Sequence, residues 1–287
     1  MNFDSYIVSN TKTSLSMPLA CLPPQKPKHS KGFKRFAFTL AETLITLTII
    51  GVIAALTVPN LLNKYTKHTY VIGLKKAYSQ LQNAIKMIPI TEGCSGDDYD
   101  CAGMFTGERI INGETVTFPT YDIDDMNFNN IPAFKSTYLL SKNLKSNKLC
   151  LGTPNECFSG NYDVSSFVEN MDTETAGYMV LADGSYIALK KYSFISVDIN
   201  GPKGPNLWGR DWFLFDIAES QGGAKAKGVH PGQLLPVGSF QYSMHGFGNA
   251  TQYWKNNNNC SSINVKNKSD LATHCTGKVL EEDAMNY

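Results

Sequence analysis

A long apolar segment near the N-terminus constrains this chain more than any other feature of its sequence. From Phe38 to Leu62 it reads FTLAETLITLTIIGVIAALTVPNLL, with Glu42 as its single charged residue. As a helix these 25 residues would span about 37 Å, against a bilayer hydrocarbon core of about 30 Å. The segment is predicted to cross a membrane once. Because an ionisable group costs about 2.5–3.5 kcal/mol at the bilayer centre, Glu42 is expected to have a function.

The residues around this acid resemble the N-terminal segment of the type IV pilins and of the pseudopilins of type II secretion systems. In that family a basic leader is cut just before a Phe, and a Glu follows four residues later. The run Phe38-Thr39-Leu40-Ala41-Glu42 fits this pattern. Lys34 and Arg35 lie in the leader, and Ala37 stands where the family usually has Gly. The specific resemblance covers residues 36 to 88, and beyond them it is architectural only.

The resemblance implies a processing site and an assembly residue. A prepilin peptidase would cleave between Ala37 and Phe38, remove the leader 1–37, and leave an N-methylated Phe38. The new amine would lie four residues from the Glu42 carboxylate, and opposite charges attract strongly at low dielectric. We expect Glu42 to set the axial register of a filament by pairing with Phe38 of an adjacent subunit. The alternative is a Glu that lies at headgroup level without such a partner.

A secretory signal peptide and a simple membrane anchor are two other interpretations of the apolar segment. A secretory signal peptide fits poorly, because its apolar part is usually about 7–15 residues long and precedes a small-residue cleavage site. A simple membrane anchor has the same length and hydropathy as a pilin stem, so only the leader motif separates the two.

Gly51 and Pro59 weaken the apolar helix, since both residues are poor helix formers. They could loosen the helix for extraction from the bilayer and repacking in a fibre. They could equally reflect the general frequency of Gly and Pro in membrane helices. The sequence leaves both explanations open.

Beyond Pro59 the apolar pattern becomes one-sided, with spacings of three and four residues. Its members are Val71, Leu74, Tyr78, Leu81, Ile85 and Ile88. This pattern predicts an amphipathic continuation of the same helix. We therefore expect a stem helix over 38–88, with a transmembrane part over 38–62 and an end set by Pro89 and Gly93.

Residues 89–287 are predicted to form a globular head on the stem. A short helix is expected around Phe134–Leu139, followed by strands at 178–182, 185–189, 194–199 and 212–217. Asp183-Gly184 is a two-residue hairpin signal between the first two strands. The expected fold class is α+β, with a long hydrophobic-then-amphipathic helix and an antiparallel sheet of about four strands. This layout resembles the pilin head.

Cysteine usage predicts an oxidising compartment. One of the seven cysteines, Cys21, lies in the proposed leader, and the other six allow many connectivities. Cys94 and Cys101 have the same short sequence spacing as Cys150 and Cys157, and Cys260 and Cys275 remain as a separate pair near the C-terminus. This pattern favours the disulfides Cys94–Cys101, Cys150–Cys157 and Cys260–Cys275. Disulfides imply a head outside the cytoplasm. We expect a single-pass protein of the bacterial inner membrane that later enters a filament in the periplasm or at the cell surface.

A Gly/Pro-rich loop before the last predicted strand carries four oxygen-bearing side chains: Asp198, Asn200, Asn206 and Asp211. Such side chains could hold Ca²⁺, and some pseudopilins carry calcium in a nearby loop. Asp and Asn also form Asx-turns without any metal. Calcium is the one candidate ligand, and no cofactor is required.

The sequence gives no indication of an enzyme. It lacks HExxH, GxSxG, P-loop and GxGxxG motifs, and its five histidines are scattered. Residues 1–37 hold six Lys or Arg and one Asp, which leaves 20 basic and 24 acidic side chains, a net charge of −4, after cleavage. This balance argues against a broad nucleic-acid interface.

The sequence therefore predicts a structural subunit of a type II secretion pseudopilus or a type IV pilus. Its expected partners are homologous subunits, the prepilin peptidase, the inner-membrane assembly platform and membrane lipid. Two alternatives remain: a membrane-tethered extracytoplasmic binding protein, and a DNA-uptake pilin.

Overall fold

A computed structural model describes residues 39–104, 109–111, 114–116, 132–169, 173, 176–190, 193–218, 229–244 and 253–287. The predicted leader 1–37 and Phe38 lie outside these residues. Contacts within the chain divide it into two units, with the boundary between Ile53 and Ala54. The fold described below belongs to the second unit, apart from the N-terminal part of the first helix.

The first helix, α1, runs from Leu40 to Thr91 without interruption. It extends past the predicted end at residue 88, because Pro89 lies inside the helix and Gly93 provides the stop. Gly93 has φ 75°, its N–H donates to the carbonyl of Ile90, and the N–H of Cys94 donates to the carbonyl of Pro89. This pair of bonds is a Schellman motif, in which a left-handed glycine closes the helix.

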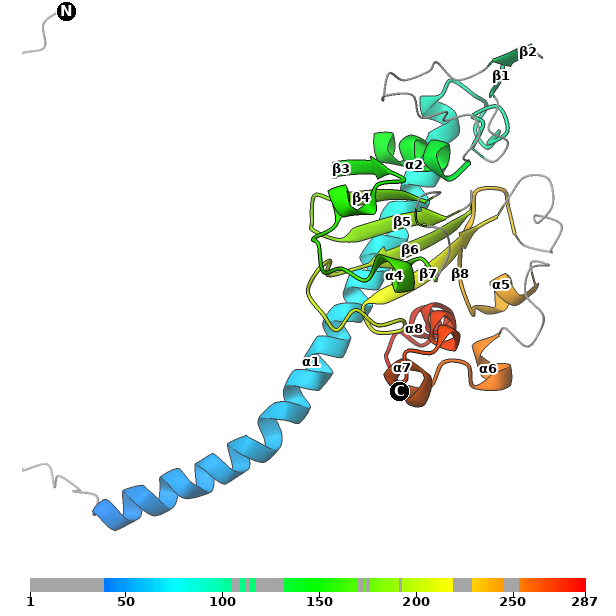
Figure 1. Ribbon diagram of the computed structural model, residues 1–287. Coiled ribbons are helices and arrows are strands. Elements are labelled where there is room, and N and C mark those ends of the chain that lie inside the picture. The colour runs from blue at the N-terminus through cyan, green and yellow to red at the C-terminus, as the bar shows by residue number, and fades with distance from the viewer. Residues whose placement is uncertain are drawn as a thin grey trace, which may run out of the picture. The chain divides into compact units, whose positions relative to one another are not determined.

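Six strands form one antiparallel sheet in which every strand pairs with its neighbours in the sequence (Figure 1). They are β3 (Ser146–Leu151), β4 (Gly177–Leu181), β5 (Tyr186–Lys190), β6 (Phe194–Asp198), β7 (Trp212–Ile217) and β8 (Leu234–Pro236). The four predicted strands correspond to β4–β7. The sequence prediction missed β3 and β8, which are the two edge strands.

The remaining elements are short. The predicted helix before Cys150 is α2 (Pro132–Asn143). The others are β1 (Arg109–Ile111), β2 (Glu114–Val116), α3 (Pro154–Cys157), α4 (Val164–Phe167), α5 (Phe240–Met244), α6 (Trp254–Asn257), α7 (Ser262–Lys266), a 3₁₀ helix (Asp270–His274) and α8 (Cys275–Glu282). The chain is therefore a mixed α+β protein, as predicted.

The β4–β5 hairpin forms where it was predicted, but its turn lies one residue earlier. The N–H of Gly184 donates to the carbonyl of Leu181, which places Ala182 and Asp183 at the centre of the turn. Gly184 has φ 87° and follows the turn, and the N–H of Leu181 donates to the carbonyl of Ser185. This is a three-residue loop with a glycine bulge rather than a two-residue turn.

The sheet is covered on both faces. One face packs against α1, where Val71, Leu74, Leu81, Ile85 and Ile88 are all buried, and Tyr78 is half-buried. The predicted amphipathic stripe is thus confirmed. Figure 1 shows this cyan part of α1 running along the far side of the sheet.

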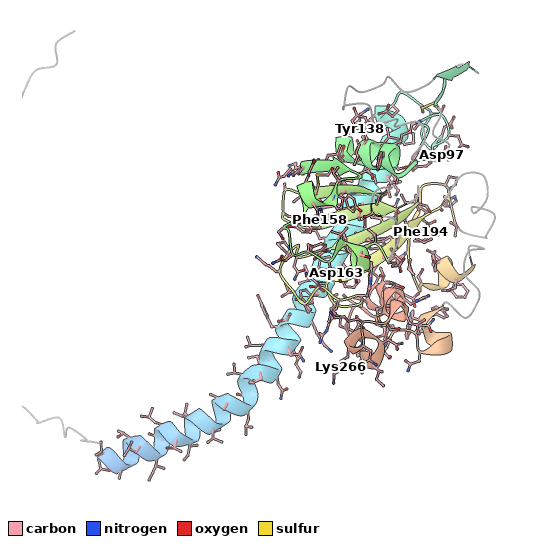
Figure 2. All side chains as sticks on the ribbon, in the orientation of Figure 1. Asp97, Tyr138, Phe158, Asp163, Phe194 and Lys266 are labelled. Carbon is pink, nitrogen blue, oxygen red and sulfur yellow. A yellow bond between two sulfur atoms is a disulfide. The ribbon has the colours of Figure 1, made fainter. Side chains whose placement is uncertain are left out.

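The opposite face packs against an aromatic layer that no periodicity in the sequence predicts. Phe158 stacks on Tyr186 at 4.4 Å between ring centroids, and Phe167 lies 5.2 Å from Trp212. Figure 2 shows Phe158 among the side chains on this side of the sheet. Double coverage explains why all residues of β5 and β7 are buried, although antiparallel strands often have one solvated face.

All three predicted cysteine pairs are formed in the structure. Their Cα–Cα distances are 5.9 Å for Cys94–Cys101, 5.8 Å for Cys150–Cys157 and 4.7 Å for Cys260–Cys275. The first bond closes the loop that follows α1. The second joins β3 to α3, and the third joins the segment before α7 to the start of α8.

Candidate functional site

The N-terminal part of α1 presents apolar side chains to its surroundings on every side. From Thr39 to Leu62 each residue is exposed except Ala54, which is half-buried. Leu40 is 78% exposed, Leu47 66% and Leu56 71%. Within the described residues, α1 is the one helix that is long and apolar enough to cross a membrane. An exposed apolar surface of this extent is typical of a segment that contacts lipid or another protein.

Glu42 takes part in a reciprocal cap at the start of α1. Its N–H donates to Thr39 Oγ1 at 3.2 Å. In return, Glu42 Oε2 accepts hydrogen bonds from the Thr39 N–H at 2.8 Å and from the Thr39 hydroxyl at 2.9 Å. This arrangement is a capping box, which satisfies two N–H groups that the first turn of a helix leaves unpaired.

The capping box fixes the carboxylate at the N-terminal tip of the helix. A negative charge is favoured there, because the aligned peptide dipoles give this end a partial positive charge. A capping role for Thr39 was not predicted, although the spacing Thr39-x-x-Glu42 is the usual signature of such a cap. The predicted cleavage point between Ala37 and Phe38 lies outside the described residues.

Gly51 and Pro59 both lie within the unbroken α1 helix. A Cβ added at Gly51 would meet no atom within 4 Å, so no contact within the described residues requires a glycine at this position. The two explanations for these residues both stay predictions.

A pair of buried carboxylates lies in the head, at the loop between β6 and β7. Asp198 is the last residue of β6, Asp211 precedes β7, and both are 0% exposed. Asp198 Oδ2 accepts hydrogen bonds from the Tyr162 hydroxyl at 2.7 Å and from the Trp212 indole N–H at 3.0 Å. Its Oδ1 accepts from the backbone N–H of Asn200 at 3.1 Å, which is an Asx-turn.

Asp211 is held by the loop itself. Its Oδ2 accepts from the N–H of Asn206 at 2.9 Å, and its Oδ1 accepts from the N–H of Leu207 at 2.8 Å. Burial raises the pKa of Asp211, and burial together with the nearby charge of Asp211 raises the pKa of Asp198 to about 7. Burial therefore favours the protonated, neutral form of Asp198 up to about neutral pH.

The structure brings together all four residues of the predicted calcium site. The Asn200 amide donates to the backbone carbonyls of Lys203 and Gly204, and the Oδ1 atoms of Asn200 and Asn206 are buried without a hydrogen-bond partner among the described residues. These two oxygens suit a calcium ligand set. The carboxylates already accept N–H and O–H donors, as a metal-free loop requires, and no cluster of three or more His, Cys, Asp or Glu occurs in the described ranges. Calcium binding by this loop therefore stays a prediction.

Sequence reasoning missed two members of this cluster, Tyr162 and Trp212. Tyr162 comes from the segment before α4, 36 residues away from Asp198 along the chain. Burial and the charge of Asp198 raise the pKa of its hydroxyl, so it remains a hydrogen-bond donor at neutral pH. No local sequence pattern predicts the contact between Tyr162 and Asp198, because it forms only when the irregular segment that contains Tyr162 folds over the sheet.

No protein-family model matches this chain, and a search of curated proteins and of solved structures likewise returns no match.

Proposed function

We propose that this chain is a structural subunit of a type II secretion pseudopilus or a type IV pilus. The observation that carries the proposal is the apolar, exposed N-terminal part of α1 over residues 40–62, with Glu42 as its only charged side chain and a capping box at its tip. In the proposal, this part of the helix enters the membrane as a single span. It then becomes the packing surface between subunits.

Electrostatics gives Glu42 its part in this proposal. Thr39 supplies hydrogen bonds to the carboxylate but no positive charge. An ionised acid in an apolar environment is strongly favoured by a cationic partner, because the attraction between charges is weakly screened there. The amine created by cleavage before Phe38 is that partner. When subunits assemble, pairing of Glu42 with the Phe38 amine of an adjacent subunit would offset the free-energy cost of the buried acid. The same pairing would fix the axial register of the filament.

The head has features that suit an extracytoplasmic filament subunit. It packs on the buried stripe of α1 and contains three disulfides, which form in oxidising compartments. In the proposal it lies outside the bacterial inner membrane, and the partners are homologous subunits, the prepilin peptidase, the assembly platform and lipid. The pilin-like layout of helix and sheet supports this assignment by analogy only.

The mass of the N-terminus tests the proposal directly. The intact mature protein, purified from cells that contain a prepilin peptidase, should begin at Phe38 and carry one additional methyl group on its amine. The matched control is the Ala37→Leu variant, whose bulkier residue at the cleavage point should leave the leader attached. A native protein that retains residues 1–37 would reject the pilin assignment and favour the membrane-tethered binding protein.

A further inference from the structure

The head begins close to the point where the apolar part of α1 ends. That part ends at Leu62, and Lys67 follows about 7.5 Å further along the helix axis. Lys67 Nζ donates to the backbone carbonyl of Met285 at 3.0 Å and to that of Tyr287. The headgroup layer on each side of a bilayer is about 5–7 Å thick. With α1 across the bilayer up to Leu62, the base of the head therefore lies against the lipid headgroups.

A continuous series of contacts forms this base. The hydroxyl of Tyr287 donates to the carbonyl of Gly209 in the loop before β7. Gly209 has φ 78°, and a Cβ added there would lie 3.0 Å from Val265 Cγ2, so the loop packs directly on α7. Figure 2 shows Lys266, the residue after Val265, at the end of the head where α1 leaves it. The base therefore includes α1 near Lys67, the loop before β7 and α7.

The base carries four cations without an acidic partner: Lys64, Arg210, Lys266 and Lys268. In the ranges that the structure describes, none of them forms a salt bridge. Lys64 lies about one turn before Lys67 on the same side of α1. Arg210 is also close to Lys67, because burial and the charge of Arg210 both lower the pKa of that lysine. The three lysines of the set are exposed, and Arg210 is half-buried.

The acidic residues near the base leave it with an excess of positive charge. Asp283 forms a salt bridge with Lys75, and Asp211 is fully buried, where it accepts hydrogen bonds from its own loop. The elements around the base also carry acids, which are outnumbered by the four cations and Lys67: Asp163, Asp270 and Glu282. The chain after cleavage has a net charge of −4. An anionic surface would therefore repel the head as a whole but attract this face.

Two exposed side chains that suit a membrane interface accompany the cations. Tyr65 is 69% exposed and follows Lys64, and tyrosine is enriched where a membrane meets water. Ile263 is 67% exposed and lies three residues before Lys266, so the two share one side of α7. Apolar side chains beside lysines are typical of helices that lie on a membrane. The four cations together with Tyr65 and Ile263 are called the basal face.

We propose that the basal face binds the phosphate groups of anionic phospholipids in the leaflet from which α1 emerges. The proposal rests on the membrane span of the proposed function. Lipid phosphates lie within reach of the basal face, because Leu62 and Lys64 are only about 3 Å apart along the helix axis. Attraction between basic side chains and an anionic leaflet falls off within a Debye length, and the base of the head lies inside that distance. A soluble acidic partner would have to displace the membrane from the same face.

Hydrogen–deuterium exchange of the full chain in lipid nanodiscs tests the proposal. One set of discs contains phosphatidylcholine alone, and the other also contains phosphatidylglycerol. Backbone amides of residues 206–211 and 262–268 should exchange at least about twofold more slowly in the anionic discs at low salt, and high salt should abolish the difference. The amides of α2, at the opposite end of the head (Figure 1), should exchange equally in both discs.

The possible failures of this experiment are distinguishable. Equal exchange of residues 262–268 in the two discs overturns the proposal, as does equal slowing by soluble glycerol phosphate in the neutral discs. A chain that does not insert into either disc overturns the membrane span, and this proposal with it. An inserted chain whose exchange does not depend on the lipid overturns this proposal alone.

A charge variant tests whether the basal face itself is responsible. Lys266→Gln with Lys268→Gln should remove at least about half of the slowing at residues 262–268 in anionic discs. Unchanged slowing in this double variant overturns the proposal.

The matched control is Lys86→Gln with Lys145→Gln, which removes the same charge from exposed positions far from the base. Lys86 lies about 36 Å beyond Leu62 along the helix axis, several times the Debye length of about 10 Å at 0.1 M salt. Lys145 lines a groove beside Met87, one residue further along α1. The control should keep the full slowing in anionic discs. A loss equal to that of the basal variant would show general charge attraction and overturn the proposal.

Discussion

Two isoleucines of α1 provide a matched test of how the head is built. Ile85 is 0% exposed and belongs to the core between α1 and the sheet, whereas Ile72 is 55% exposed on the same helix. Replacing each by Ala removes the same atoms and slightly improves helix propensity in both cases. Any difference between the two variants therefore reports the packing of the side chain against the sheet.

The expected difference is large. Truncation of a buried isoleucine to Ala costs about 2–5 kcal/mol, while an exposed substitution usually stays within about 0.5 kcal/mol. For a domain of this size 1 kcal/mol shifts the melting temperature by about 2–4 °C. Ile85→Ala should thus lower the melting temperature by about 5–15 °C, and Ile72→Ala should change it by less than about 2 °C.

Thermal unfolding of the full chain in detergent, followed by near-ultraviolet circular dichroism, measures this difference. Near-ultraviolet signals report the aromatic residues of the head rather than the helix content of α1. Equal melting temperatures for the two variants would refute the reasoning, because the helix stripe would then contribute nothing to the stability of the head.

Further predictions concern the acids and the disulfides. Glu42→Gln keeps an acceptor for the Thr39 N–H but loses the charge, so membrane insertion should persist while incorporation into filaments, measured by shearing and immunoblotting, drops at least about tenfold. Normal filament yield would contradict the pairing with Phe38. The double variant Cys260→Ala and Cys275→Ala should lose about 3 kcal/mol in urea unfolding, since its disulfide closes a loop with a sequence separation of 15 residues. An unchanged unfolding midpoint would show that this bond does not restrain the unfolded chain. Because the pKa of Asp198 is raised to about 7, the folded state binds more protons than the unfolded state between about pH 4 and 7, and its contribution to stability falls as pH rises through that window. Asp198→Asn should flatten this decline in pH-dependent melting curves, and a decline of equal slope in the variant would assign it to another group. If the loop holds calcium, a chelator at neutral pH should lower the melting temperature of the unmodified chain but not of Asp198→Asn; equal curves with and without chelator would leave the Asx-turn explanation.

The long helix and the central strands were predictable because their signals are continuous. The stripe from Val71 to Ile88 repeats over several turns, and β4–β7 contain long apolar runs between turn residues. The edge strands β3 and β8 were not predicted, for physical reasons. β3 begins with the polar run Ser146-Asn147-Lys148, and β8 has only three residues and ends in Pro236, a composition that suits a sheet edge.

The second layer could not have been predicted from periodicity. Phe158 and Trp208 lie in irregular segments, so no regular spacing marks them as core residues. These residues are buried because they pack on the second apolar face of the sheet. That face exists only after the strands have paired, so it leaves no local pattern in the sequence. The same holds for Tyr162, whose contact with Asp198 depends on the path of that covering segment. In contrast, the contact between Thr39 and Glu42 is local and was readable from the sequence.

Glu42 and Asp198 show how two acids in apolar settings lead to different consequences. Around Asp198 the protein supplies three hydrogen-bond donors from three residues, and burial shifts the group toward its neutral form. Within the described residues, Glu42 accepts hydrogen bonds from one residue, Thr39, at an exposed helix tip. Hydrogen bonds satisfy the acceptor atoms of a carboxylate, but they do not neutralise its charge. The head can therefore stabilise its own buried acid, whereas a stem placed in lipid or among other helices needs a cation from elsewhere. This asymmetry is the physical reason to expect that Glu42 acts between subunits and Asp198 within one.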